Sequence, residues 1–192
     1  DSDDGYRQVI VSLSWNGTSW DSFNFDFYIS NNIIRNTANT IHNERTGILV
    51  GSGNPGAKVR IFNNIIYDGS RNSASSTDAG IYTGDLDVTV YAYNNTISNF
   101  TRGFQINGGS GKIIAKNNIV QDCDDGFASG GYDASSDYNI SDVADDAPSP
   151  SYRSGLATDV AFVNEAGYDF HLAQTDTAAR GAGANLTADA NL

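Results

Sequence analysis

The sequence predicts an all-β fold in which short strands form the successive coils of a parallel solenoid. Two markers recur along the chain in a fixed order: a pair of asparagines followed by aliphatic residues, and a glycine followed by a large apolar residue. Between them, small or branched residues alternate with bulky or charged ones, which is typical of strands that bury one face. Two markers that keep one phase indicate structural repeats of about 22 residues with three short strands each.

The asparagine marker defines one turn of each predicted coil. Its second asparagine is Asn32, Asn64, Asn95 and Asn118, at spacings of 32, 31 and 23 residues, and a weaker fifth copy contains Asn139. Equivalent residues of stacked coils lie about 4.8 Å apart, so the side-chain amide of one asparagine can hydrogen-bond to the next. We therefore expect these asparagines to form a ladder.

The glycine marker precedes the apolar residue of another strand. It is found at Gly47-Ile48, Gly80-Ile81, Gly103-Phe104 and Gly126-Phe127. Glycine at this position allows a tight turn with positive φ. We expect two inward columns of the core, one of Ile48, Ile81, Phe104 and Phe127 and the other of Val59, Val90 and Ile113.

With these repeats, residues 25–144 resemble the parallel β-helix of the pectate-lyase-like superfamily, and residues 6–24 are expected to add an irregular earlier coil. The resemblance implies a right-handed single-stranded parallel β-helix of about five coils. In that fold, the first strand of each coil begins at the glycine marker, the second precedes the asparagine pair and the third follows it.

The C-terminal stretch resembles the end segment of secreted bacterial β-helix proteins, which closes the helix near a surface anchor. The similarity lies in Ala161-Phe162-Val163-Asn164, in Tyr168-Asp169-Phe170-His171-Leu172 and in residues 178–183. It implies an irregular C-terminal cap. We therefore divide the chain into a β-helix over 1–144, a surface linker over 145–155 that contains Pro and Ser, and a segment over 156–192 that packs on or caps the helix.

Composition excludes several classes of function. The net charge of −12 repels phosphate backbones, so no nucleic-acid partner is expected. No apolar run approaches the roughly 20 residues that cross a bilayer, so no membrane insertion is expected. The chain contains no Met, which indicates a processed product or a fragment, and its low Lys content, abundant Asn, Ser, Thr and Gly, and acidic pI favour a secreted or cell-surface protein.

In the superfamily, catalytic sites usually lie over the first strands. The outward positions there are Leu49, Tyr82, Gln105 and Ala128. A polysaccharide lyase needs a base and a cation that neutralises the uronate. Tyr82 with Arg102, Arg45 or Arg71 is the set that could meet this need, although solvated loop charges explain these arginines better.

The outer face of the second strands is a candidate glycan-binding surface. It combines aromatic and cationic residues: Tyr28, Arg60, Tyr91, Tyr93 and Lys116. Such side chains hold sugar rings and acidic glycans. Two other interpretations remain open, since the same rows could simply stack on one another or could be covered by the C-terminal segment.

The loop acids Asp122, Asp124 and Asp125 offer hard oxygen ligands, so Ca²⁺ is a possible ligand, and no other cofactor is expected. No twelve-residue calcium loop is present in the sequence. Asp124 and Asp125 are adjacent, and on a strand they would face opposite ways, which disfavours the paired carboxylates of a hydrolase. The single cysteine, Cys123, excludes an internal disulfide.

These observations favour a non-catalytic secreted or cell-surface β-helix that acts in adhesion, in glycan binding or as an extracellular structural unit. Its expected partner is a polysaccharide or a cell-surface glycan. One alternative is a small polysaccharide lyase or related carbohydrate-active enzyme. Another is self-association into a filament, because the ends of a solenoid expose unpaired strand edges.

Overall fold

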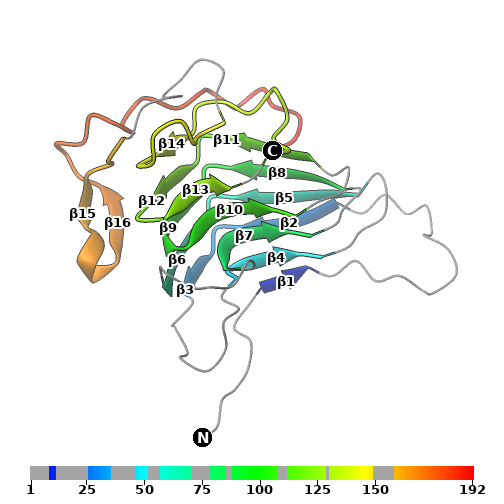
Figure 1. Ribbon diagram of the computed structural model, residues 1–192. Helices are drawn as coiled ribbons and strands as arrows, with labels where there is room; N and C mark the ends of the chain where they lie inside the picture. Colours follow the sequence, from blue (N-terminus) through cyan, green and yellow to red (C-terminus); the bar gives the residue numbers. More distant parts are fainter. Residues whose placement is uncertain are drawn as a thin grey trace, which may run out of the picture.

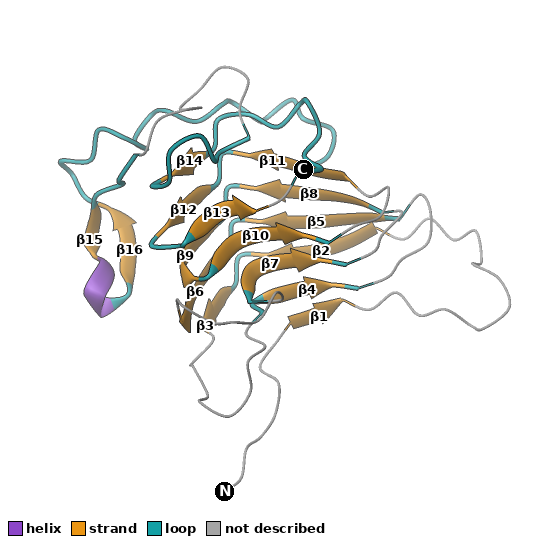
Figure 2. Cartoon of the chain, in the orientation of Figure 1, coloured by secondary structure: helices purple, strands orange, loops and turns teal. Residues whose placement is uncertain are grey.

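The computed structural model describes residues 9–11, 26–35, 46–51, 57–70, 78–84, 88–107, 112–128, 130–148 and 158–192. Within these ranges the chain is all-β, with parallel strands stacked in sheets as in a parallel β-helix (Figure 1). One short 3-10 helix, η1 (Glu165–Gly167), is the only helical element of the described residues (Figure 2). No helix of the described part is long and apolar enough to cross a membrane.

Three parallel sheets contain the strands of successive coils. The first-strand sheet has the order β1 (Val9–Val11), β4 (Ile48–Val50), β7 (Ala79–Thr83), β10 (Arg102–Ile106) and β13 (Asp125–Ala128). The second-strand sheet consists of β2 (Asp26–Ser30), β5 (Lys58–Phe62), β8 (Thr89–Tyr93) and β11 (Lys112–Lys116). The third-strand sheet consists of β3 (Ile33–Arg35), β6 (Ile65–Ser70), β9 (Thr96–Phe100), β12 (Ile119–Gln121) and β14 (Ile140–Ser141). Each strand pairs with its equivalent one coil away, and the strand order within a coil is the one that the resemblance implied.

Both predicted columns of the core are confirmed. Ile48 pairs with Ile81, Ile81 with Phe104, and Phe104 with Phe127, and all four are at most 5% exposed. The rings of Phe104 and Phe127 stack with centroids 5.0 Å apart and an interplanar angle of 10°. The second column consists of Val59, Val90 and Ile113, which are paired in register and buried. Residues that neighbour each other in these columns therefore come from different coils, which makes the core continuous along the stack.

The asparagine ladder is also present, and Asn139 adds a fifth member. Each Nδ2 donates to the Oδ1 of the next asparagine at 2.9–3.0 Å, along the series Asn32, Asn64, Asn95, Asn118 and Asn139. The same Oδ1 atoms accept the backbone N–H of the preceding member at 3.0–3.1 Å. The ladder thus supplies both donors and acceptors to a buried turn.

The first asparagine of each pair has a separate structural role. The residues at this position have φ values of 54° to 59°: Asn31, Asn63, Asn94 and Asn117. Asparagine tolerates this left-handed conformation better than most residues because its short polar side chain can hydrogen-bond locally. The pair therefore combines a residue that turns the chain with a residue that joins the coils.

The glycine marker serves close packing rather than a positive φ, contrary to our expectation. Among the described glycines, only Gly131 and Gly181 have φ in the left-handed range. A Cβ atom at Gly103 would overlap Val120 Cγ1 and the carbonyl oxygen of Gly126. Glycine is needed here because the backbones of neighbouring coils and the third-strand sheet approach too closely for a side chain.

Acidic and hydroxyl side chains cover the last strand edges of the stack. Asp146 Oδ1 and Oδ2 accept the N–H groups of Phe127 and Gly126, each at 2.8 Å, and Ser136 Oγ accepts the N–H of Ala115 at 3.0 Å. Ala147 belongs to the buried core cluster. Residues 145–148 of the predicted linker therefore pack on the last coil, residues 149–157 lie outside the described part, and the domain boundaries at 144 and 155 stay predictions.

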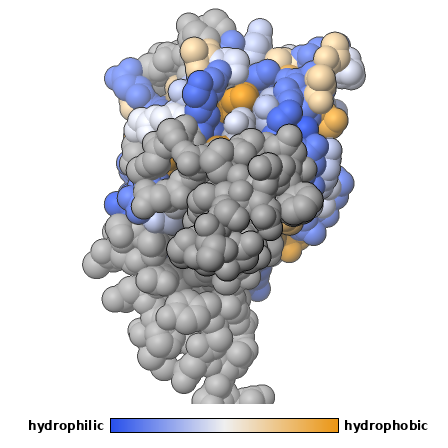
Figure 3. Space-filling view, turned by 90° about the vertical axis from the view of Figure 1, so that its right-hand side faces the viewer, coloured by the Kyte–Doolittle hydropathy of each residue, from blue (hydrophilic) through white to orange (hydrophobic). Residues whose placement is uncertain are grey.

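The C-terminal residues run along the outside of two sheets. Strands β15 (Phe162–Asn164) and β16 (Asp169–Leu172) form an antiparallel hairpin, shown in orange in Figure 1, beside the third-strand sheet. Leu172 and Phe162 pack against a buried cluster that includes Ile140 of β14. Farther along, the side chain of Asn117 bonds both backbone groups of Ala184. On the face that Figure 3 shows, the described residues that are visible are mostly hydrophilic, with some apolar ones among them.

Candidate functional site

The first-strand face does not bring Tyr82 and Arg102, two of the candidate catalytic residues, together. Tyr82 is only 8% exposed, and its hydroxyl accepts a hydrogen bond from Asn107 Nδ2 at 2.9 Å. Arg102 pairs with Ala79, which precedes Tyr82 by three residues. The Cα atoms of Arg102 and Tyr82 are therefore offset by about 10 Å along the strand direction. Arg102 instead lies beside Asp125, whose carboxylate form it favours. Arg45 lies outside the described residues.

The candidate glycan-binding residues lie together on the second-strand sheet. Tyr28 pairs with Arg60, Arg60 with Tyr91, and Tyr93 with Lys116. The guanidinium of Arg60 lies 5.0 Å from the ring centroid of Tyr28 and 5.5 Å from that of Tyr91. The side chains of neighbouring coils therefore stack on one another, which was one of the two other interpretations of this face.

The C-terminal residues cover part of the second-strand face, which was the remaining interpretation of these side chains. Lys116 Nζ contacts Asp189 Oδ2 at 2.9 Å, and Arg60 Nε donates to the carbonyl oxygen of Asn191 at 2.9 Å. Tyr93 is 1% exposed, and burial together with Asp189 raises its pKa. Tyr28, which is 57% exposed, keeps an open ring.

The three candidate calcium ligands occupy different surroundings. Asp125 lies beside Asp146, and burial and that neighbour raise its pKa. Asp122 lines a cavity under the hairpin, and Asp124 is exposed. Within the described residues, no group of three or more His, Cys, Asp or Glu side chains is placed to hold a metal ion.

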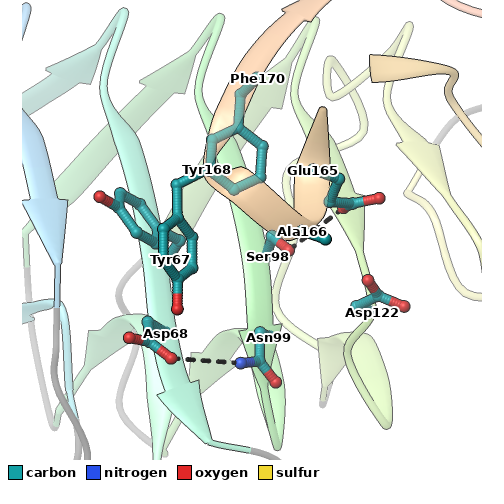
Figure 4. Close-up of a pocket in the computed structure, with 9 residues that line it drawn as sticks. All are labelled: Tyr67, Asp68, Ser98, Asn99, Asp122, Glu165, Ala166, Tyr168 and Phe170. Atoms are coloured by element: carbon teal, nitrogen blue, oxygen red, sulfur yellow. Dashed lines mark hydrogen bonds between the residues drawn. The ribbon is translucent and has the colours of Figure 1, made fainter. Parts of the chain in front are cut away.

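A cavity of about 630 Å³ lies between the hairpin and the third-strand sheet, and we call it the hairpin cavity (Figure 4). It is lined by Tyr67, Asp68, Ser98, Asn99, Asp122, Glu165, Ala166, Tyr168 and Phe170. Its size is within the range of about 300–1,000 Å³ that is common for small-molecule sites. Of the residues proposed from the sequence, only Asp122 belongs to it, so this site was missed.

Aromatic rings gather on one side of the hairpin cavity. The centroid of Tyr67 lies 4.9 Å from that of Tyr168 and 5.2 Å from that of Phe170. The Arg35 guanidinium lies 4.4 Å from the Tyr168 centroid, and its Nη2 donates to the Tyr168 hydroxyl at 3.1 Å. These contacts attach the hairpin to the sheet and hold the rings in place.

Apart from Ala166, polar side chains form the rest of the lining, with Glu165 and Asp122 across from the rings (Figure 4). Glu165 Oε1 accepts from Ser98 Oγ at 3.4 Å, and its Oε2 accepts from Gln121 Nε2 at 2.9 Å. Burial and the nearby negative charge of Asp122 raise the pKa of Glu165. The carboxylate is thus oriented by two neutral donors but lies close to another acid.

The polar floor of the cavity arises from one corner of the coil. Asp68, Asn99 and Asp122 follow equivalent positions of β6, β9 and β12, and their φ values are 69°, 62° and 55°. Aspartate and asparagine suit this left-handed corner, so the turn geometry itself places a column of oxygen-bearing side chains there. An Asp or Asn four residues after the asparagine pair in three successive repeats was the signal in the sequence that could have indicated this column.

No protein-family model, curated protein or solved structure matches the chain.

Proposed function

We propose that the chain is a right-handed single-stranded parallel β-helix of about five coils, capped by its C-terminal segment, that is secreted or displayed at the cell surface and binds carbohydrate without catalysis. The observation that carries the proposal is the hairpin cavity, in which aromatic rings face hydroxyl-binding side chains. The acidic, Asn-rich composition supports the extracellular location.

The lining of the hairpin cavity suits a sugar on both sides. The apolar face of a pyranose ring packs on an aromatic side chain, and its hydroxyls hydrogen-bond to carboxylates and amides. Tyr168 is 42% exposed and offers ring surface, while Asn99 and Asp122 offer polar atoms opposite. Most of these groups stand on or directly after strands of the third-strand sheet, which is a rigid support for recognition.

Two observations favour this function over the alternatives. A lyase at the first-strand face would depend on Tyr82, which is buried and bonded to Asn107. A filament built by end-to-end strand pairing would need free N–H groups at the end of the stack, where Asp146 and Ser136 already accept those of β13 and β11. A single unit that binds glycan requires neither.

Isothermal titration calorimetry with a panel of neutral, acidic and amino-bearing oligosaccharides tests the proposal. Tyr168→Asn removes the exposed ring but keeps a residue that accepts the left-handed φ of 63° at this position. We expect it to weaken binding at least about fivefold, which corresponds to ~1 kcal/mol of lost stacking.

Tyr28→Ala is the matched control, because it removes an exposed ring from the second-strand face instead. We expect it to leave binding unchanged. Loss of binding in Tyr28→Ala with full binding in Tyr168→Asn would move the site to the second-strand face. Absence of binding to every member of the panel would refute a carbohydrate function.

A further inference from the structure

The charge of the hairpin cavity restricts the kind of sugar that fits it. Its ionisable lining residues other than tyrosine are Asp68, Asp122 and Glu165, and among the residues that the structure describes no Lys, Arg or His lines it. Arg35 approaches from the edge, where its Nε contacts Asp68 Oδ2 at 3.0 Å. That contact offsets one acid at the rim, next to the rings, and adds no positive charge to the side of the cavity that Glu165 occupies.

Glu165 and Asp122 form the acidic side of the cavity (Figure 4). They come from η1 and from the corner after β12, and the donors that orient Glu165, Ser98 and Gln121, are neutral. Burial and the neighbouring charge of Asp122 both raise the pKa of Glu165, because like charges held close together in a partly buried place repel each other. A bound cation would relieve this repulsion, whereas a uronate would add to it.

The aromatic side of the cavity limits the ligand in a second way. A small inorganic cation would not use the exposed ring surface of Tyr168, and within the described residues no group of three or more His, Cys, Asp or Glu side chains is placed to hold a metal ion. A ligand that contacts both the aromatic and the acidic side therefore needs a ring with an apolar face. It also needs a positive charge about one sugar width from that face.

We infer that the hairpin cavity binds an amino sugar with a free ammonium group, with its ring against Tyr168 and its ammonium between Asp122 and Glu165. This inference rests on the proposed carbohydrate function and specifies its ligand class. A protonated primary amine can donate three hydrogen bonds, which suits two carboxylates and the neighbouring Asn99 amide oxygen.

The matched probes are glucosamine tetramer and N-acetylglucosamine tetramer, which differ only in the acetylation of the amine. We expect the full chain to bind the free amine at least about tenfold more tightly in calorimetry at low ionic strength, and this preference to shrink with added salt. Cadaverine, a linear diamine with no sugar ring, is expected to bind at least tenfold more weakly than the amine tetramer.

Two isosteric variants locate the preference. Asp122→Asn keeps a residue suited to the left-handed corner. Glu165→Gln keeps an oxygen that can accept from Gln121 Nε2, while its new NH2 group can donate to Ser98 Oγ. We expect each to reduce the amine preference at least about threefold. Asp133→Asn removes the same charge from an exposed turn next to β11 and is expected to leave the preference unchanged.

The outcomes separate the inference from the proposed function. Equal affinity for the two tetramers, or an unchanged preference in both cavity variants, would overturn the amino-sugar assignment but would leave carbohydrate binding in place. Cadaverine binding as tightly as the amine tetramer would also overturn it, since the site would then select charge alone. Failure of both tetramers and of every other glycan in the panel would refute the proposed function itself.

Discussion

Replacing Asn95 by alanine tests whether the ladder holds the coils together. Its Oδ1 accepts the backbone N–H of Asn64 at 3.1 Å and the Asn64 Nδ2 group at 3.0 Å. Its Nδ2 donates to the carbonyl oxygen of Ile61 at 2.8 Å and to Asn118 Oδ1 at 3.0 Å. Asn95 is 1% exposed, so water cannot replace these partners without opening the turn. Asn95→Ala leaves the backbone N–H of Asn64 and the carbonyl group of Ile61 without these hydrogen-bond partners.

The magnitude follows from those two groups. A buried polar group that loses its partner costs about 1–3 kcal/mol, so we expect Asn95→Ala to lower the free energy of unfolding by about 2–6 kcal/mol. The two side-chain groups that also bond to Asn95 keep other partners, since Asn64 Nδ2 still donates to the carbonyl oxygens of Ile29 and Phe62 and Asn118 Oδ1 still accepts the backbone N–H of residue 95. They add little to the loss, and we expect a value of about 3–4 kcal/mol.

Urea unfolding followed by far-UV circular dichroism measures this difference. Asn94→Gly is the matched control, since Asn94 is the exposed neighbour, has a φ of 54° that glycine adopts freely, and receives only the Asn117 Nδ2 bond of 3.1 Å on its side chain. We expect the control to change stability by less than about 1 kcal/mol. Equal, small losses in the two variants would refute the view that the inner ladder stabilises the stack.

Three further predictions concern the core, pH dependence and the C-terminal residues. Phe104→Ala should lower the free energy of unfolding by about 3–5 kcal/mol in the same urea assay, because it removes a fully buried ring from the middle of a column. Burial and Asp146 raise the pKa of Asp125 above its unfolded value, so the ionised carboxylate opposes folding. Asp125→Asn should therefore stabilise the chain at pH 7 by up to about 1 kcal/mol. This gain in stability should vanish as the pH falls through the raised pKa of Asp125. Asp189→Ala should speed hydrogen exchange of the amides around residue 189 by at least about tenfold while changing global stability by under about 1 kcal/mol, because its ion pair with Lys116 is partly exposed; unchanged exchange would contradict the covering role of these residues.

The repeat made the stacked sheets predictable. The hairpin cavity was not predictable, because it forms from contacts between residues that the repeat does not relate. The core columns and the ladder follow from positions that recur once per coil, so one register fixes all of them. Tyr67 and Tyr168 meet although they are far apart in the chain, and only the path of the C-terminal segment brings them together. The sequence indicated a C-terminal segment that packs on or caps the helix, but it did not determine which sheet face that segment covers.

Local conformation set a second limit on prediction. The sequence indicated why the second asparagine of each pair recurs, but the left-handed φ of the first, such as Asn94, is a property of the turn that becomes evident only from backbone geometry. The glycine marker shows the same limit, since the recurrence of Gly103 was recognised correctly while its cause was wrong. Recurrence identifies a constraint on a position without identifying which physical requirement imposes it.

The path of the C-terminal segment has a consequence for how the protein unfolds. In a simple solenoid each coil contacts only its neighbours, so terminal coils can fray while the middle stays folded. Here residues 158–192 bond to Ser141 near one end of the stack and to Arg35 and Arg60 near the other. Fraying of either end must also break these external contacts, which couples coils that do not touch each other. The segment thereby turns a one-dimensional array into a single cooperative unit, and its detachment would restore independent, stepwise loss of the coils.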